Sequence, residues 1–161
     1  MKIILSSLLF STFLLAQTQQ LIIDAQNFEA NDKKGISTFT GDVKLKMGKD
    51  KLNAQKVEII FVSKKGETNK IPSKYIATGK VDFEIVTDLK HYIGNGDKIE
   101  YSPIKQEYTV TGNGFLQEKN DDRKIYGDKI YVNQLSGEAK VNGSDKKPVR
   151  FIINVERGSQ K

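Results

Sequence analysis

The chain has 161 residues and a formal net charge of +6 at neutral pH, which fits one small domain with a modest basic surplus. Hydrophobic residues make up 37% and charged residues 29%, so the chain can bury a core, although an economical one. It contains no cysteine, which excludes disulfide bridges and thiolate metal sites. The basic surplus suits partners that carry phosphate, but scattered surface charge would give the same total.

The first 16 residues have the pattern of a secretory signal peptide. Met1-Lys2 supplies a positive start, Ile3 to Leu15 is an apolar run of 13 residues, and Ala16 precedes a polar stretch. A membrane-spanning helix needs about 20 apolar residues, so a retained anchor is the weaker alternative. We therefore expect residues 1–16 to be a cleaved signal peptide and residues 17–161 to form an exported domain. Export removes nucleic acid from the expected partners.

Beyond the leader, apolar and polar residues alternate with a period of two. This spacing places each apolar set on one face of a strand, as in a half-buried antiparallel sheet. The alternating runs are Val43 to Met47, Val57 to Phe61, Val81 to Ile85, Ile99 to Tyr101, Ile130 to Val132 and Phe151 to Val155. Turn signals separate them at Asn31-Asp32, Lys65-Gly66, Gly94-Asn95-Gly96, Ser102-Pro103, Asn113-Gly114, Asn120-Asp121-Asp122 and Asn142-Gly143. The pattern predicts an all-β protein of the sandwich, jelly-roll or barrel type.

An internal repeat runs through the same region. A hydroxyl-bearing residue is followed by glycine at Gly41, Gly79, Gly112 and Gly137, and a second apolar strand follows each of the first three copies. One hairpin cannot bury its apolar face alone, so the units are expected to stack. Glycine at the same point in each copy predicts a tight bend or bulge. Stacked hairpins also leave two open ends, whose unpaired edges can accept another strand.

No catalytic or metal-binding constellation stands out. His91 is the single histidine, so zinc or Ser-His-Asp chemistry would depend on it alone. The segment from Gly94 to Asp97 lacks the Lys-Ser/Thr of a phosphate loop, and Asn120 to Asp122 is better explained as a hairpin tip than as a cation site. Glu58 and Glu100 alternate with apolar neighbours and should face solvent, unlike the carboxylate pair of a glycosidase. We expect no enzyme activity, no metal and no cofactor.

Three short motifs, in this order, resemble the OstA-like family. Leu21 to Ala25 is an apolar strand that ends in an acidic–Ala step, Phe39 to Val43 contains Thr-Gly-x-Val, and Leu52 to Val57 has the pattern Leu-x-Ala-x-x-Val. The resemblance covers residues 21–155.

The later repeats depart from that pattern. Gly114 replaces an expected apolar residue, and Gly94 stands where the first repeat has Leu52. These departures leave the register of the middle strands open.

The resemblance implies an elongated, twisted, V-shaped antiparallel β-jelly roll with open ends. It also implies a periplasmic protein that carries the acyl chains of lipopolysaccharide in a groove and bridges the inner and outer membranes. The implied partners are lipopolysaccharide, an LptC-type inner-membrane protein at the N-terminal edge, an LptD-type outer-membrane translocon at the C-terminal edge, and further copies of the chain, head to tail.

The expected groove is lined by inward apolar residues of the stacked hairpins, although each of them could also serve only as packing. Burying a methylene group contributes about 0.8 kcal/mol, so a chain of ~12 carbons gains roughly 10 kcal/mol from such a groove. The residues expected to line it are Val43, Leu45, Val57, Ile59, Phe61, Ile76, Val81, Phe83, Ile85, Ile99, Tyr101, Val110, Phe115, Ile130, Val132 and Val141.

The two ends of the domain supply the expected partner edges, with ordinary terminal strands as the alternative. The N-terminal edge comprises Leu21, Ile22, Ile23, Asp24 and Ala25, and the C-terminal edge comprises Phe151, Ile152, Ile153, Asn154 and Val155. Basic residues that could meet lipid phosphates, or simply be solvated, are Lys44, Lys46, Lys80 and Arg150.

Three other hypotheses stay open from the sequence. One is an LptC-type protein of the same pathway whose leader remains as a membrane anchor. Another is a periplasmic β scaffold with no lipid cargo. The third is a secreted carbohydrate-active enzyme.

Overall fold

In the computed structural model, which describes residues 19–158, the chain forms ten β-strands joined in one antiparallel sheet. They are β1 (Leu21–Asp24), β2 (Asn27–Asn31), β3 (Ile36–Met47), β4 (Asp50–Ser63), β5 (Lys70–Val86), β6 (His91–Ser102), β7 (Glu107–Glu118), β8 (Arg123–Asn133), β9 (Ala139–Asn142) and β10 (Arg150–Ile152). The all-β prediction is confirmed. The predicted signal peptide, residues 1–16, lies outside the described residues. Residues 19–158 hold no helix of the length and hydropathy that a membrane span requires.

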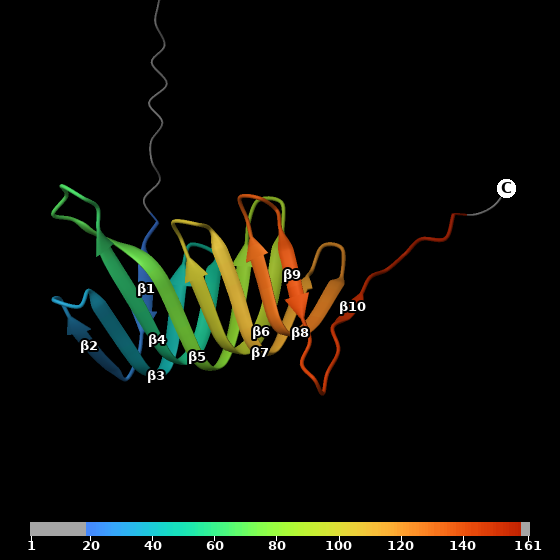
Figure 1. Cartoon of the computed structure of the whole chain (residues 1–161), viewed down its shortest axis with the longest axis horizontal. Helices are drawn as coiled ribbons and strands as arrows, with labels where there is room; N and C mark the ends of the chain where they lie inside the picture. The colour runs from blue at the N-terminus through green and yellow to red at the C-terminus, as the bar shows by residue number, and fades with distance from the viewer. Residues whose placement is uncertain (1–18, 159–161) are drawn as a thin grey trace, which may run out of the picture.

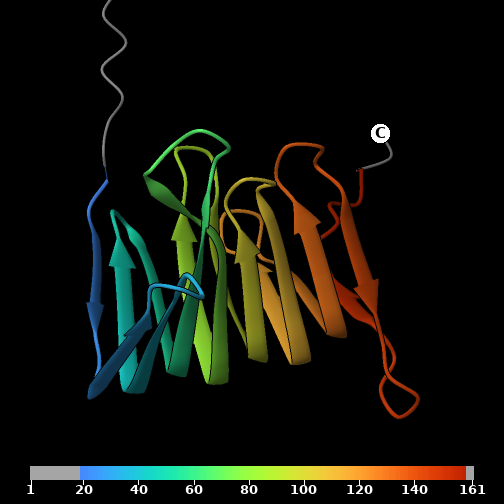
Figure 2. The ribbon, with the colours of Figure 1, turned by 60° about the vertical axis from the view of Figure 1, so that its left-hand side comes forward.

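The long strands β3 to β8 bend in the middle, so the sheet folds back on itself as two facing layers (Figures 1 and 2). In β3, Thr40 and Val43 pair with Lys56 and Ala54, so two residues of β3 oppose one residue of β4. The register shifts at the equivalent place in β5 and in β7. Such β-bulges bend and twist a strand, and here they align along the edge where the two layers meet. The result is the V-shaped trough that the OstA-like resemblance implied.

Glycine makes these bulges possible, as the repeat predicted. Gly41, Gly79 and Gly112 have φ values of +85°, +83° and +77°, in the left-handed region that side chains disfavour. At each of them a Cβ atom would also collide with a neighbouring side chain, which is Gln26 at Gly41, Gln55 at Gly79 and Asp97 at Gly112. The fourth copy differs, because Gly137 lies in the turn between β8 and β9, where its N–H donates to the carbonyl of Asn133.

Two predicted turns are instead parts of strands. Gly94 to Gly96 lies inside β6, and Asn113-Gly114 lies inside β7 at its bulge. The physical reason at Gly94 is close packing rather than chain reversal, because a Cβ atom there would lie 2.4 Å from Cζ of Phe83. Glycine in a strand interior often marks such a close approach.

The core lies between the two layers. One row of inward side chains crosses the sheet through consecutive strand partners, from Val57 through Ala77, Ile99 and Val110 to Ile130. The buried apolar residues are Val43, Ala54, Val57, Ile59, Ala77, Val81, Phe83, Ile99, Val110 and Ile130.

The two ends of the trough are sheet edges. At one end β1 and β2 pair with the two halves of β3, and at the other end β10 and β9 pair with the two halves of β8. Within residues 19–158, each of these four short strands is paired on one side only. The sheet therefore stays open at both ends, as the stacked-hairpin pattern predicted.

Candidate functional site

An apolar cleft lies between the two layers, on the side away from the bend. It encloses about 90 Å³ and is partly open to solvent. The back layer, made of the second halves of β3, β5 and β7 and the first halves of β4, β6 and β8, contributes Leu45, Leu52, Phe83 and Ile85. The front layer, made of the other halves of these strands, contributes Tyr75, Ile99, Tyr101 and Tyr108. Asp50, Lys51 and Glu84 are charged residues at its margin.

The cleft is small for a ligand site. Pockets that hold drug-sized molecules enclose about 300–1,000 Å³, several times the 90 Å³ here. An extended apolar guest therefore needs the side chains or the two layers to move apart. The absence of any described strand across the open side makes such movement possible.

Three tyrosines form a ladder on the front wall of the cleft. Tyr75, Tyr101 and Tyr108 are direct neighbours on three adjacent strands, with ring centroids 6.0 Å and 4.2 Å apart. Burial raises the pKa of Tyr75 above its usual range, and the Tyr101 hydroxyl adds to that effect. Burial also raises the pKa of Tyr108, with further contributions from Tyr101 and from the Asp50 carboxylate. This wall thus presents aromatic faces together with neutral hydroxyl groups.

The raised pKa of Tyr108 predicts a loss of stability in alkali. In the unfolded chain this tyrosine ionises near pH 10, whereas in the fold it holds its proton to higher pH. The folded state therefore binds more protons above pH 10, and its stability falls as pH rises from there. We expect the melting temperature to drop above pH 10, and to drop less in Tyr108→Phe. Equal pH profiles for wild type and Tyr108→Phe would contradict this assignment.

Most of the residues expected to line the groove point between the layers. Val43, Val57, Ile59, Val81, Phe83, Ile99, Val110 and Ile130 are buried there. Leu45, Phe61, Ile85, Val132 and Val141 pack against this core while partly exposed. Tyr101 lines the cleft itself.

Ile76 and Phe115 differ from that expectation, because both lie on the outer face. Ile76 pairs with Glu58 and Glu100, between the inward residues Tyr75 and Ala77. In a run of three apolar residues, alternation alone does not say which face the middle one takes.

The inward positions of β7 keep a period of two across its bulge, from Val110 through Gly114 to Leu116, so Phe115 lies on the outer face. Its ring packs against outward Tyr126, with ring centroids 4.9 Å apart and a tilt of 36°, and Leu116 takes the inward position opposite Gly94. Inward residues that the sequence interpretation missed include Leu52, Tyr75, Tyr108, Leu116 and Ile125. Continuing the alternation from Val110 through the bulge would have found Leu116.

The expected partner edges are shorter than predicted. Leu21 to Asp24 form β1, and Ala25 lies just after it. At the other end only Phe151 and Ile152 belong to β10, while Ile153, Asn154 and Val155 lie beyond it. Ile152 pairs with Lys124, and β8 begins one residue before that, at Arg123, so little backbone remains for a longer pairing.

None of the four basic residues considered for lipid phosphates lines the cleft. Lys44 and Lys46 alternate with inward Val43 and Leu45, so both lie on the outer face. Lys80 is at the bend of β5, and Arg150 pairs with outward Tyr126. The carboxylates Glu58 and Glu100 also face outward, as expected, and form ion pairs with neighbouring lysines.

His91 forms a pair with Glu84, with 2.7 Å between Nε2 and Oε1. No three His, Cys, Asp or Glu side chains gather into a possible metal site in the part of the chain that the structure describes.

Comparison with known proteins places these features in a family. Residues 22–138 match the family model described as LptA/(LptD N-terminal domain) LPS transport protein. The crystal structure of LptH, the LptA-homologous periplasmic component of the lipopolysaccharide transport device of Pseudomonas aeruginosa, is similar with a TM-score of 0.69. The match has 17% sequence identity and covers 85% of this chain and 96% of that one, which shows a shared fold. No curated protein sequence matches. The chain therefore belongs to the LptA/(LptD N-terminal domain) family of LPS transport proteins, in agreement with its OstA-like motifs and its resemblance to LptA.

Proposed function

We propose that this protein is exported to the periplasm without residues 1–16 and carries lipopolysaccharide by binding its acyl chains in the cleft. The observation that carries the proposal is an apolar trough that runs between two layers and is open along one side and at both ends. Such a trough can hold a chain while leaving a polar headgroup in water. The role is binding and transfer, with no chemical step.

The energetics favour this use of the trough. Each methylene that leaves water contributes about 0.8 kcal/mol, so one acyl chain of ~12 carbons gains roughly 10 kcal/mol. Part of that gain offsets the cost of separating the side chains that line the cleft, such as Leu45, Phe83 and Ile85. Chains of this kind therefore supply the driving force to widen a cleft that is narrow without them.

The open ends support end-to-end assembly by strand addition. The glycine bulges occur in every second long strand, in β3, β5 and β7. The strand that precedes a bulged strand places a side chain over its glycine: Gln55 of β4 covers Gly79, and Asp97 of β6 covers Gly112. Gln26, between β1 and β2, covers Gly41 in the same way, so the N-terminal edge repeats the covering type of strand.

Bulged and covering strands alternate along the sheet, and β8 is a covering strand. The C-terminal edge, formed by β9 and β10, therefore occupies the position of the next bulged strand. A C-terminal edge laid against the N-terminal edge of the next copy would continue the alternation. This contact is heterologous and can extend without closing. The OstA-like resemblance implies the partners at the two ends of such an assembly, an LptC-type protein at the N-terminal edge and an LptD-type protein at the C-terminal edge, and we include them in the proposal.

Photo-crosslinking with purified lipopolysaccharide and the full-length protein tests the proposal. A photoreactive residue at Phe83, inside the cleft, should form adducts with the lipid, whereas one at outward-facing Ile76 should not. Photoreactive residues at Ile22 and Ile152, on the two edges, should crosslink one copy of the chain to another.

Adducts that form equally at Phe83 and Ile76, or at neither, would contradict lipid carriage and favour a scaffold without cargo. Lipid adducts without chain-to-chain adducts would keep the carrier and reject the end-to-end assembly.

A further inference from the structure

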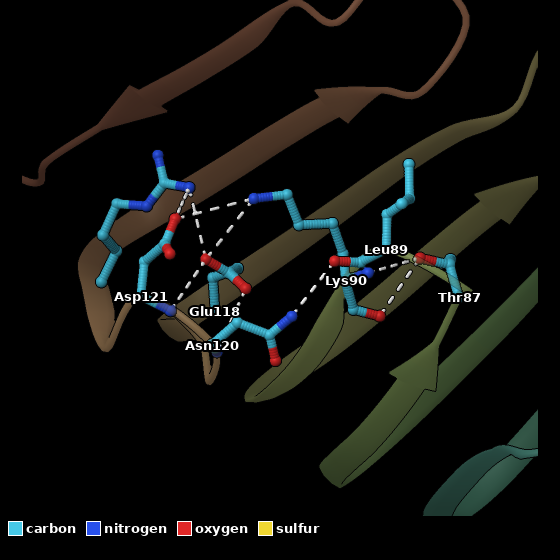
Figure 3. Close-up of polar contacts among 7 residues, drawn as sticks. Thr87, Leu89, Lys90, Glu118, Asn120 and Asp121 are labelled. Carbon is cyan, nitrogen blue, oxygen red and sulfur yellow. Dashed lines mark hydrogen bonds and ion pairs between the residues drawn. The ribbon is translucent and has the colours of Figure 1, made fainter.

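A charged cluster joins two turns at the free end of the back layer (Figure 3). Glu118, the last residue of β7, has a side chain only 6% exposed, and its carboxylate accepts hydrogen bonds from the backbone N–H groups of Asn120 and Asp121 at 3.2 and 3.3 Å. Lys90 Nζ, from the turn between β5 and β6, lies 3.7 Å from the same carboxylate, and the Arg123 guanidinium lies 3.2 Å from it. A buried carboxylate requires such partners, so Glu118 holds both cations at this place.

This cluster stands beside the lipid cleft. Glu118 pairs with Tyr92, which pairs with Ile85, and Ile85 lines the cleft. Directly paired residues share a face of the sheet, so all three side chains point toward the front layer. Adjacent strands are about 4.8 Å apart, which places Glu118 about 10 Å from Ile85 along the rim.

One exposed carboxylate oxygen lies between the two cations. Asp121 Oδ2 is 2.7 Å from Arg123 and 3.7 Å from Lys90. The Asp121 side chain is 56% exposed on a turn, and ion pairs of such exposed groups contribute little stability. In addition, Arg123 Nε is buried and has no acceptor among residues 19–158. The buried Glu118 carboxylate therefore holds both cations in place, whereas the exposed Asp121 carboxylate contributes little to holding them.

We propose that Lys90 and Arg123 bind a phosphate monoester on the headgroup of the lipid whose acyl chains fill the cleft, and that the phosphate displaces Asp121. This inference rests on the proposed function. A phosphate monoester offers three strong acceptor oxygens, and a guanidinium binds two of them side by side. With Asp121 turned away, two cations face one buried carboxylate, which leaves a net positive charge for the anion. The acyl chains would then lie in the cleft with the headgroup at its rim.

The test compares two lipids that differ only in phosphate: bisphosphorylated lipid A and the same lipid A after dephosphorylation. Dissociation constants are measured by calorimetry on the full-length protein. Wild type should bind the phosphorylated lipid more tightly, and Lys90→Gln should reduce that preference about fivefold, as for loss of one partly exposed charged contact. Asp121→Asn, which removes the competing carboxylate, should increase the preference.

Lys74→Gln is the matched control. Lys74 also lies 3.7 Å from a glutamate oxygen and is 46% exposed, against 39% for Lys90, but it belongs to the outer face. Its substitution should leave the preference unchanged. Melting temperatures of all variants identify any loss of folding.

The outcomes distinguish failure of the phosphate site from failure of the lipid-binding cleft. Binding of both lipids with no preference, or a preference that Lys90→Gln and Asp121→Asn leave intact, overturns the phosphate site while the carrier function stands. If neither lipid binds to wild type, the proposed function itself fails. If inorganic phosphate alone binds to wild type and not to Lys90→Gln while the two lipids bind equally, the site takes free phosphate and the lipid assignment is overturned.

Discussion

Replacing Gly94 with valine is expected to lower the free energy of unfolding by about 3 kcal/mol, the upper part of the usual range for overpacking a core. A Cβ atom at this position would lie 2.4 Å from Cζ of Phe83 and 2.6 Å from the backbone oxygen of Phe115. The first contact could be relieved by turning the ring, but the second requires the β7 backbone to move. Chemical denaturation of wild type and variant gives the measurement.

Two further variants make this prediction specific. Gly158→Val provides the control, because a Cβ atom at Gly158 meets nothing within 4 Å, and its stability should match that of wild type. The double variant Phe83→Ala/Gly94→Val should lose less stability than the sum of the two single variants, since the valine no longer meets the phenylalanine ring. A Gly94→Val protein as stable as wild type would show that Phe83 does not lie over Gly94.

Replacing Ile130 with alanine is expected to cost about 3 kcal/mol, whereas the same change at Ile76 should cost less than about 1 kcal/mol. Ile130 is 1% exposed between the layers, where neighbouring strands prevent the cavity from collapsing. Ile76 lies on the outer face among charged partners, where water replaces the lost side chain. The two substitutions remove the same atoms, so denaturation midpoints compare the two faces directly.

This pair also tests which face of the sheet forms the trough. A cost at Ile76 that equals the cost at Ile130 would contradict the outward placement of Ile76. It would restore the interpretation, made from alternation alone, that Ile76 belongs to the groove.

Local pattern predicted most of this fold for a physical reason. A strand has a side-chain period of two, so the apolar residues from Val43 to Leu45 and from Val57 to Phe61 identify one face without any knowledge of neighbours. Glycine is the residue that tolerates the left-handed backbone of the repeated bulge, so Gly41, Gly79 and Gly112 mark the bends in advance.

The sequence predictions are wrong where the pairing of two strands, and not the pattern of one strand, sets the position of a residue. Gly94 was expected in a turn, because glycine next to asparagine is a common turn signal. In the fold, the absence of a side chain at Gly94 leaves room for the ring of Phe83 from the neighbouring strand β5. Phe115 was expected inside, but strand pairing places Leu116 opposite inward Gly94 and places Phe115 beside outward Tyr126. The β10 strand ends early because its partner β8 begins at Arg123.

The sequence by itself determined the all-β class, the repeat, the open ends and the family resemblance, since these follow from periodicity, glycine positions and short motifs. Only the tertiary structure decided the width of the cleft, the tyrosine ladder along its wall and the cluster at Glu118. Those features combine residues from strands and turns that lie far apart in the chain, such as Lys90 with Arg123 and Tyr75 with Tyr108. Distances between them depend on how strands pair across the sheet, and no local pattern encodes that pairing.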